Sequence, residues 1–165
     1  METAWRSLPG ARRSADQPAA ALETHLGYWL RLVSNEVSRA FERALRKRNI
    51  SVAEWVALNQ LATGIGLTPA KLAATMGMTR GAISKVLEKL ASKKLISRSI
   101  SLLDNRVQLL SLTDQARRIL PQLTSIADGN DDYFFAALKS DEKVALRNLL
   151  RKLAGVHQIT RIPVE

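Results

Sequence analysis

Residues 68–112 constrain the fold of this chain more than any other segment, because two short helical patterns directly precede two strand-like runs. Thr68 and Pro69 form an N-cap followed by proline at the first helical position. Gly77 suits the left-handed turn that ends a helix, and Thr79 caps the next pattern. The order predicts a helix-turn-helix followed by a β-hairpin.

The second helical pattern and the runs after it differ in period. From Ile83 the apolar residues fall at i, i+3, i+4 and i+7, which places them on one face of a helix. After Lys94 apolar residues alternate with polar ones, first over residues 96–102 and again over 107–112. Asp104-Asn105 lies between the two runs and predicts the turn of the hairpin.

Helical patterns also precede this segment. Apolar residues at helical spacing from Leu22 to about Arg48 predict one amphipathic helix of about seven turns. Ser51-Val52-Ala53-Glu54 is a capping-box pattern that starts a further helix. Thr63-Gly64-Ile65-Gly66 is expected to end it.

Two more helical patterns follow the hairpin. Thr113 is expected to cap the first of them. Pro121 is expected to kink or restart that helix, because proline has no N–H to donate, and Gly129 marks a second weak point. Ser140 is expected to cap the last helix, whose apolar stripe runs to Val156.

The whole pattern predicts a mainly α fold with a small β-hairpin wing. The apolar stripes at both ends exceed what a compact winged core needs, so they predict a helical dimerisation layer. The first residues, rich in Pro, Gly, Ala and Arg, read either as a flexible arm or as an extra DNA-contacting tail. The predicted boundaries are a flexible arm at 1–20, a domain at 21–156 and a tail at 157–165, with a winged lobe at 50–112 and dimerisation helices at 21–48 and 113–156.

Charge indicates the kind of partner. The 25 lysines and arginines outnumber the 15 acidic residues, and the net charge of +10 favours a polyanion. Nucleic acid is the first candidate and an anionic membrane surface the second, while a merely solvated basic surface is the alternative. Residues 75–106 hold seven cations and two anions, so +5 of the total lies in the helix-turn-helix and hairpin.

Other classes of function lack their motifs. The absence of cysteine excludes disulfides and thiolate zinc sites and fits a cytoplasmic location. No apolar run approaches the roughly 18–20 residues of a membrane span. No phosphate loop, metal motif or catalytic triad is present in the sequence, so no cofactor, metal or enzymatic activity is expected. His25 and His157 read as packing or surface residues, with a metal or pH role as the alternative.

The N-terminal half of the second helix is the predicted reader of the DNA major groove, which admits one α-helix. Arg80 and Lys85 are expected to donate to guanine or to phosphate, and Ser84 to contact a base edge or a phosphate. Gly81 permits close approach to the DNA. Thr79 and the amides at the helix start are expected to bind a phosphate.

The hairpin adds a second predicted contact. Arg106 lies just past its tip, where an arginine can enter the narrow minor groove. Asp104 can hold the guanidinium through a charge-assisted pair; the alternative is that both residues only close the turn. Lys89 and Arg98, two further cations of this segment, complete the predicted DNA-contacting set.

On these motifs the chain, from about Leu22 to Val156, resembles the MarR family of transcriptional regulators, named for multiple antibiotic resistance. Asp104-Asn105-Arg106 followed by Leu112-Thr113 is similar to the family's wing signature of Asp-x-Arg and a downstream Leu-Thr. The helix-turn-helix of residues 68–95 is the second similar segment. Their order between long helices is more specific than either alone.

The resemblance implies a homodimer that grips a palindromic double-stranded DNA operator with two recognition helices and two wings. It also implies control by a small aromatic effector bound between the dimer layer and the DNA lobe. Ala116 and Lys94 stand where the family commonly has glycine. Pro121 and Gly129 lie in a helix that the family usually has continuous.

Four aromatic residues are candidates for the effector pocket. Tyr28, Trp29 and Trp55, with Phe41, can line an apolar ligand site, although helical spacing fits plain core packing as well. The leading hypothesis is a sequence-specific regulator, most simply a repressor. The alternative is a non-specific basic protein that binds nucleic acid as an architectural element.

Overall fold

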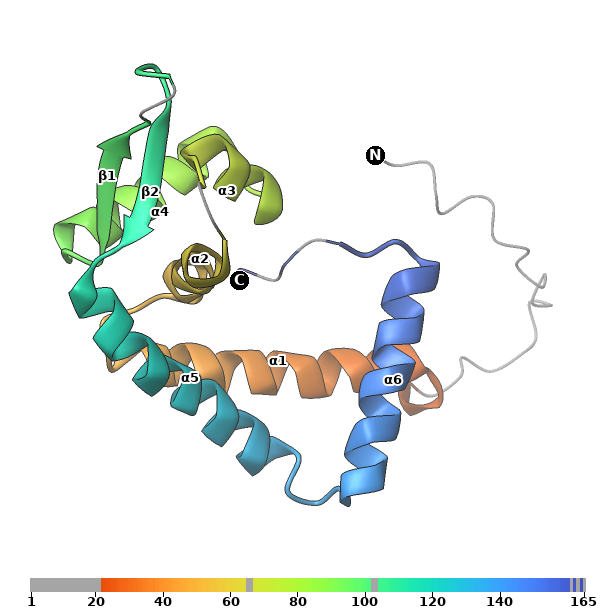
Figure 1. The fold of residues 1–165 in the computed structure, drawn as a ribbon. Coiled ribbons are helices and arrows are strands. Elements are labelled where there is room, and N and C mark those ends of the chain that lie inside the picture. The colour runs from red at the N-terminus through yellow and green to blue at the C-terminus, as the bar shows by residue number, and fades with distance from the viewer. Residues whose placement is uncertain (1–21, 65–66, 102–103, 161, 163, 165) are drawn as a thin grey trace. The chain divides into compact units, whose positions relative to one another are not determined.

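A computed structural model describes residues 22–64, 67–101, 104–160, 162 and 164 (Figure 1). The chain divides into two units, Met1–Ser34 and Asn35–Glu165. Six α-helices and one two-stranded antiparallel sheet form the described part, after a short 3-10 turn at Leu22–Thr24. The elements are α1 (Leu26–Arg46), α2 (Val52–Thr63), α3 (Pro69–Thr75), α4 (Arg80–Ser92), β1 (Ile96–Ile100), β2 (Gln108–Leu112), α5 (Asp114–Phe134) and α6 (Ser140–Val156).

The predicted N-caps of the central helices are confirmed. The Ser51 hydroxyl accepts from the Glu54 amide, and the Glu54 carboxylate accepts from the Ser51 amide, which completes the capping box of α2. Thr68 caps α3 and Thr79 caps α4, each hydroxyl accepting from the amide three residues on. These local bonds explain why short helices begin where the sequence predicts.

Four of the described helices end in the same way, with one residue at positive φ. In each, this residue donates to the carbonyl three residues back, and the next residue donates to the carbonyl five back. Lys94 adopts φ 57° at the end of α4, so the glycine common there in the family has a steric reason. The four residues are Asn49, Gly77, Lys94 and Gln158, with φ of 57°, 63°, 57° and 52°.

The hairpin pairs Ile96 with Leu112 at its base and Ile100 with Gln108 toward its tip. The Leu110 amide also donates to the Leu67 carbonyl at 2.8 Å, so the segment before α3 lies beside β2. The predicted alternation of buried and exposed residues fails in β1, where Ile100 is 65% exposed. Only the base of the hairpin packs on the helices, so no apolar surface covers its outer half.

A restart of the fifth helix at Pro121 is wrong, because α5 continues from Asp114 to Phe134 through Pro121 and Gly129. Pro121 and Arg117, the residue four back that loses a backbone donor, are both exposed, so water can satisfy the free carbonyl. Near Gly129, the Asn130 amide donates to the Val37 carbonyl of α1 at 3.2 Å, which fastens the helix there.

Two predicted helix starts are also corrected. The long N-terminal helix begins at Leu26 rather than Leu22, because a 3-10 turn precedes it. The last helix is capped at Lys139, one residue before the predicted Ser140. The Lys139 amide donates to the Glu142 carboxylate at 2.7 Å, so the acidic first turn, more than the serine, sets the start.

The core lies among α2, α3, α4, the base of the hairpin and the first half of α5, closed by the end of α1. The predicted stripe of α4 is buried in it, from Ile83 to Leu90. The stripes of the outer helices are not buried: α6 has no buried residue, and α1 buries only Leu45.

Candidate nucleic-acid interface

The helix-turn-helix consists of α3, a turn over residues 76–79, and α4. Met76, which ends α3, is buried, and Gly77 at φ 63° reverses the chain within that turn. The apolar stripe of α4 packs inward, so the opposite face of α4 is held outward by a rigid core. A helix that enters a DNA groove needs an exposed face held in place in this way.

Five predicted contact residues lie together at the N-terminal half of α4, and all five are exposed: Thr79, Arg80, Gly81, Ser84 and Lys85. The Ser84 hydroxyl donates to the Arg80 carbonyl at 2.9 Å, which leaves its oxygen lone pairs to accept from a base. A Cβ built on Gly81 meets nothing within 4 Å, so nothing within the described protein requires glycine there.

The start of α4 offers backbone donors. The Thr79 hydroxyl already accepts from the Ala82 amide at 3.2 Å, so Thr79 acts as the helix cap. The amides of Arg80 and Gly81 precede the intrahelical ladder and point toward the positive end of the helix dipole. This end of the helix therefore suits a phosphate.

The tip of the wing is a tight turn over Asp104–Val107, closed by the Val107 amide donating to the Asp104 carbonyl at 2.9 Å. The Asp104 carboxylate also accepts from the Arg106 amide at 2.9 Å and from Arg106 Nε at 3.2 Å. These two bonds, the backbone one first, lower the pKa of Asp104 below its ordinary 3.8. Arg106 lies within the turn, one position closer to the tip than predicted, with its side chain 91% exposed.

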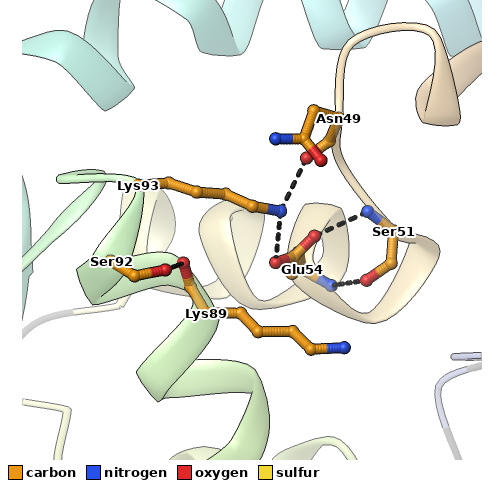
Figure 2. A network of polar contacts seen from close by, with 6 residues as sticks. All are labelled: Asn49, Ser51, Glu54, Lys89, Ser92 and Lys93. Carbon is orange, nitrogen blue, oxygen red and sulfur yellow. Dashed lines mark hydrogen bonds and ion pairs between the residues drawn. The ribbon is translucent and has the colours of Figure 1, made fainter.

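The remaining two predicted contacts lie apart from these groups. Arg98 is exposed on β1, opposite Leu110 of β2. Lys89, in the C-terminal half of α4, lines a pocket of about 350 Å³ together with Ser51 and Glu54 of α2. Figure 2 shows the Lys89 side chain beside this capping box.

A polar network at the end of α4 was not predicted from the sequence. Lys93 Nζ donates to Glu54 Oε1 and to the Asn49 carbonyl, both at 2.6 Å (Figure 2). The sequence marked Glu54 as a capping residue, whereas Lys93 was only one of the seven cations counted in residues 75–106. Lys93 is instead engaged in an ion pair that is largely buried, and 39 residues of separation hid its partner.

The aromatic candidates fall in two places. Tyr28 and Trp29 lie in the unit Met1–Ser34, where their rings meet edge to face at 5.3 Å. Trp55 lies in the other unit and packs edge to face on Phe41 at 4.9 Å. Its indole Nε1 is buried and has no hydrogen-bond partner among the described residues. Trp29 Nε1, by contrast, donates to the Glu23 carbonyl.

A pocket of about 710 Å³ lies between the C-terminal part of α5 and α6. One wall is acidic and one is basic, and among the described residues no ion pair joins them. Leu146 and Leu150 of α6 also line the pocket. The charged lining residues are Asp128, Asp131 and Asp132 on α5, and Lys143, Arg147 and Arg151 on α6.

Two other kinds of feature bear on function, a metal site and a membrane span. Over the described residues, no three histidine, aspartate or glutamate side chains form a group that could hold a metal ion. No helix in the same part of the chain is long and apolar enough to cross a membrane.

Known proteins are similar to this chain in sequence. A model of the MarR family matches residues 48–106, from the end of α1 to the wing turn. An HTH-type transcriptional repressor from Mycobacterium bovis is 27% identical over 130 residues, which are 79% of this chain and 94% of the relative. An HTH-type transcriptional regulator from Bacillus cereus is 28% identical over 146 residues, with 83% and 93% covered.

The fold is similar to a solved complex as well. A mutant MarR from E. coli, crystallised with operator DNA, matches with a TM-score of 0.68 and 25% identity. The match covers 78% of this chain and 92% of that chain.

Proposed function

Because the chain belongs to the MarR family of DNA-binding transcriptional regulators, we propose that it is a homodimeric repressor of a palindromic operator. The single observation that carries this proposal is the exposed cationic start of α4 beside a wing whose tip is an exposed arginine. The relative from Mycobacterium bovis is named a repressor, which supports repression. The E. coli structure holds operator DNA, which supports operator binding.

In this proposal α4 reads the major groove. Arg80 and Lys85 donate to guanine edges or phosphates, and Ser84, whose proton is bonded to the Arg80 carbonyl, accepts from a base edge. Thr79 sets the helix start, and the close backbone at Gly81 lets α4 sit deep in the groove. Lys89 and Arg98, which lie away from this face, contribute to the positive field more than to base contacts.

The wing is proposed to read the minor groove with Arg106. The bond to Asp104 uses Nε, one of five donors of the guanidinium, so the terminal amino groups remain for acceptors in the groove. Asp104 holds the side chain at the tip and lowers the freedom that it would lose on binding. This assigns both residues a role beyond closing the turn.

Dimerisation is proposed to cover the apolar stripes of the outer helices. Leu149 is 60% exposed and Leu153 51% exposed on α6, and Leu30 is 53% exposed on α1. Patches of this kind mark protein interfaces. The α5–α6 pocket suits a second copy, because its acidic residues on α5 and basic residues on α6 can pair with the opposite charges of the same surface across a two-fold axis.

Release by a small aromatic effector is the finer part of the proposal. Trp55 offers an unpaired, buried N–H beside Phe41, and a buried donor without a partner is unfavourable until an acceptor reaches it. An aromatic acid has both the ring and the acceptor. Tyr28 and Trp29 remain candidates for the same ligand only through the family resemblance.

Selection of bound duplexes from a random pool tests the core of the proposal. A palindromic consensus, bound at least about a thousandfold more tightly than random duplex, is expected for a specific regulator. A ratio near one would favour the alternative, a non-specific basic nucleic-acid-binding protein. Sedimentation at micromolar concentration tests the dimer, and a monomeric mass would contradict it.

A further inference from the structure

The Glu54–Lys93 pair joins the ends of three helices. Glu54 lies in the first turn of α2, Lys93 is the C-cap of α4, and Asn49 follows the end of α1. Lys93 Nζ lies 2.6 Å from both the Glu54 carboxylate and the Asn49 carbonyl (Figure 2). One ammonium group therefore fastens the end of the recognition helix to α1 and α2.

Capping alone does not explain this arrangement. The capping box needs only Glu54 Oε2, which accepts from the Ser51 amide at 2.7 Å. A capping glutamate can leave its other oxygen in water, yet the Glu54 side chain is only 2% exposed and Oε1 meets Lys93. Burying a charge is costly, and a neutral pair of similar shape is often equally stable. The ion pair is therefore explained better by the placement of the helix ends than by a gain in stability.

The backbone at both ends of the contact is also special. Asn49 at φ 57° and Lys94 at φ 57° end α1 and α4 in the same left-handed turn. Ile50 and Leu95, the residues after these turns, are both buried. The ammonium thus bridges two helix ends whose backbone course is already defined, which makes the link between α1 and α4 stiff.

We propose that the Glu54–Lys93 pair is a positioning element that sets the spacing between the two recognition helices of the dimer. This inference rests on the proposed dimeric operator binding. If α1 belongs to the dimer layer, the link from α1 to α4 fixes how far each recognition helix stands from the two-fold axis. Neither residue needs to touch DNA, because both act through the placement of α4.

The test uses the full chain with E54Q/K93M, which removes both charges and keeps side-chain size. The amide oxygen introduced by E54Q can still accept from the Ser51 backbone N–H, so α2 keeps its cap. Affinity is measured for the duplex that the wild type selects and for the same duplex with one base pair inserted between half-sites. The ratio of the two affinities is expected to fall about tenfold relative to wild type.

The matched control is E36Q/R39M, which removes an exposed ion pair of the same net charge from α1. Its affinity ratio is expected to stay within about twofold of wild type. K93R, which keeps a cation at this position, is expected to retain most of the wild-type spacing preference. A double variant E54Q/K93M that discriminates spacing as well as the control would overturn the proposal.

A measurement without DNA separates this inference from the proposed function. Amide hydrogen exchange at the end of α4, at Lys94 and Leu95, is expected to speed up about tenfold in E54Q/K93M. Unchanged exchange would overturn the positioning role even where an operator is known. A chain that selects no palindrome yet shows the faster exchange would contradict the dimeric operator model and the spacing role while leaving the stiff link itself in place.

Discussion

The winged lobe buries its apolar residues, whereas the outer helices leave theirs exposed. In α4 the stripe from Ile83 to Leu90 is buried, and Leu72 of α3 is 0% exposed. In α6 a stripe of similar spacing stays open, with Leu149 60% exposed. The same apolar pattern is therefore buried by its own chain in the lobe and left exposed in the described outer helices, where a partner is proposed to cover it.

The largest expected effect comes from Lys93→Met in the lobe. It leaves the Glu54 carboxylate buried without its cation, and breaking such a pair costs about 3–5 kcal/mol of unfolding free energy. Urea denaturation followed by circular dichroism measures it. Arg39→Met, which breaks the exposed pair on α1, is the control and is expected to cost less than about 1 kcal/mol. Equal losses of unfolding free energy in the two variants would contradict the difference between the buried and the exposed ion pair.

Two matched truncations compare the regions directly. Leu72→Ala is expected to lower the unfolding free energy by about 2–5 kcal/mol at every protein concentration, since it opens a cavity in a closed core. Leu149→Ala is expected to act mainly on association, so its thermal midpoint should depend on concentration. Calorimetry at several concentrations, with sedimentation, measures both effects. The comparison fails if Leu149→Ala lowers the midpoint equally at all concentrations.

The wing tip is exposed like the outer helices but is proposed to meet DNA. Arg106→Ala is expected to weaken operator binding by about 1–3 kcal/mol and to leave unfolding nearly unchanged. Fluorescence anisotropy with a labelled duplex gives the affinity. Arg39→Ala removes one exposed cation from α1 and controls for charge. Unchanged affinity for Arg106→Ala would remove the wing arginine from the binding model.

Two glycines at exposed helix positions, Gly81 in α4 and Gly129 in α5, sharpen the comparison further. Gly81→Ala is expected to stabilise α4 by about 0.5–1 kcal/mol, since its added Cβ meets nothing within 4 Å. Operator affinity should nevertheless fall, because the methyl group stands where α4 is proposed to approach DNA. Gly129→Ala in α5, equally open, should stabilise without a loss of affinity. Equal affinity of both variants would argue against close approach at Gly81.

The smallest effect concerns pH. The two Arg106 bonds lower the folded pKa of Asp104, so any stability that it contributes is present above its unfolded value near 3.8. That contribution is lost as pH falls through the lowered pKa. Asp104 should therefore stay ionised at any pH well above 3.8. NMR titration of its carboxyl carbon tests this, and a midpoint above 3.8 would contradict the turn geometry.

Local patterns account for most of what could be predicted. Thr68, Thr79 and Ser51 cap helices through bonds that span three residues, so sequence spacing alone placed them. The hairpin and the exposed start of α4 follow from period and turn residues in the same way. The predicted contacts at Arg80 and Arg106 were therefore found on exposed surface, while their DNA contacts remain predictions.

Errors arose where distant residues decide the outcome. Pro121 does not restart α5, because the exposure of its face, which the tertiary structure sets, lets water satisfy the Arg117 carbonyl. Lys93 was counted only among the cations of residues 75–106, because its partner Glu54 lies 39 residues back in the sequence. No spacing rule reports such pairs, since the intervening chain must first fold.

The sequence by itself determined the helix boundaries near caps, the winged helix-turn-helix and the excess of apolar stripe at both ends, since each depends on residues close along the chain. Tertiary structure alone decided which apolar stripes are buried, which cation is buried and that α5 continues through Pro121. The physical reason is that burial and ion pairing depend on what packs against a residue, which neighbouring residues in the sequence do not specify.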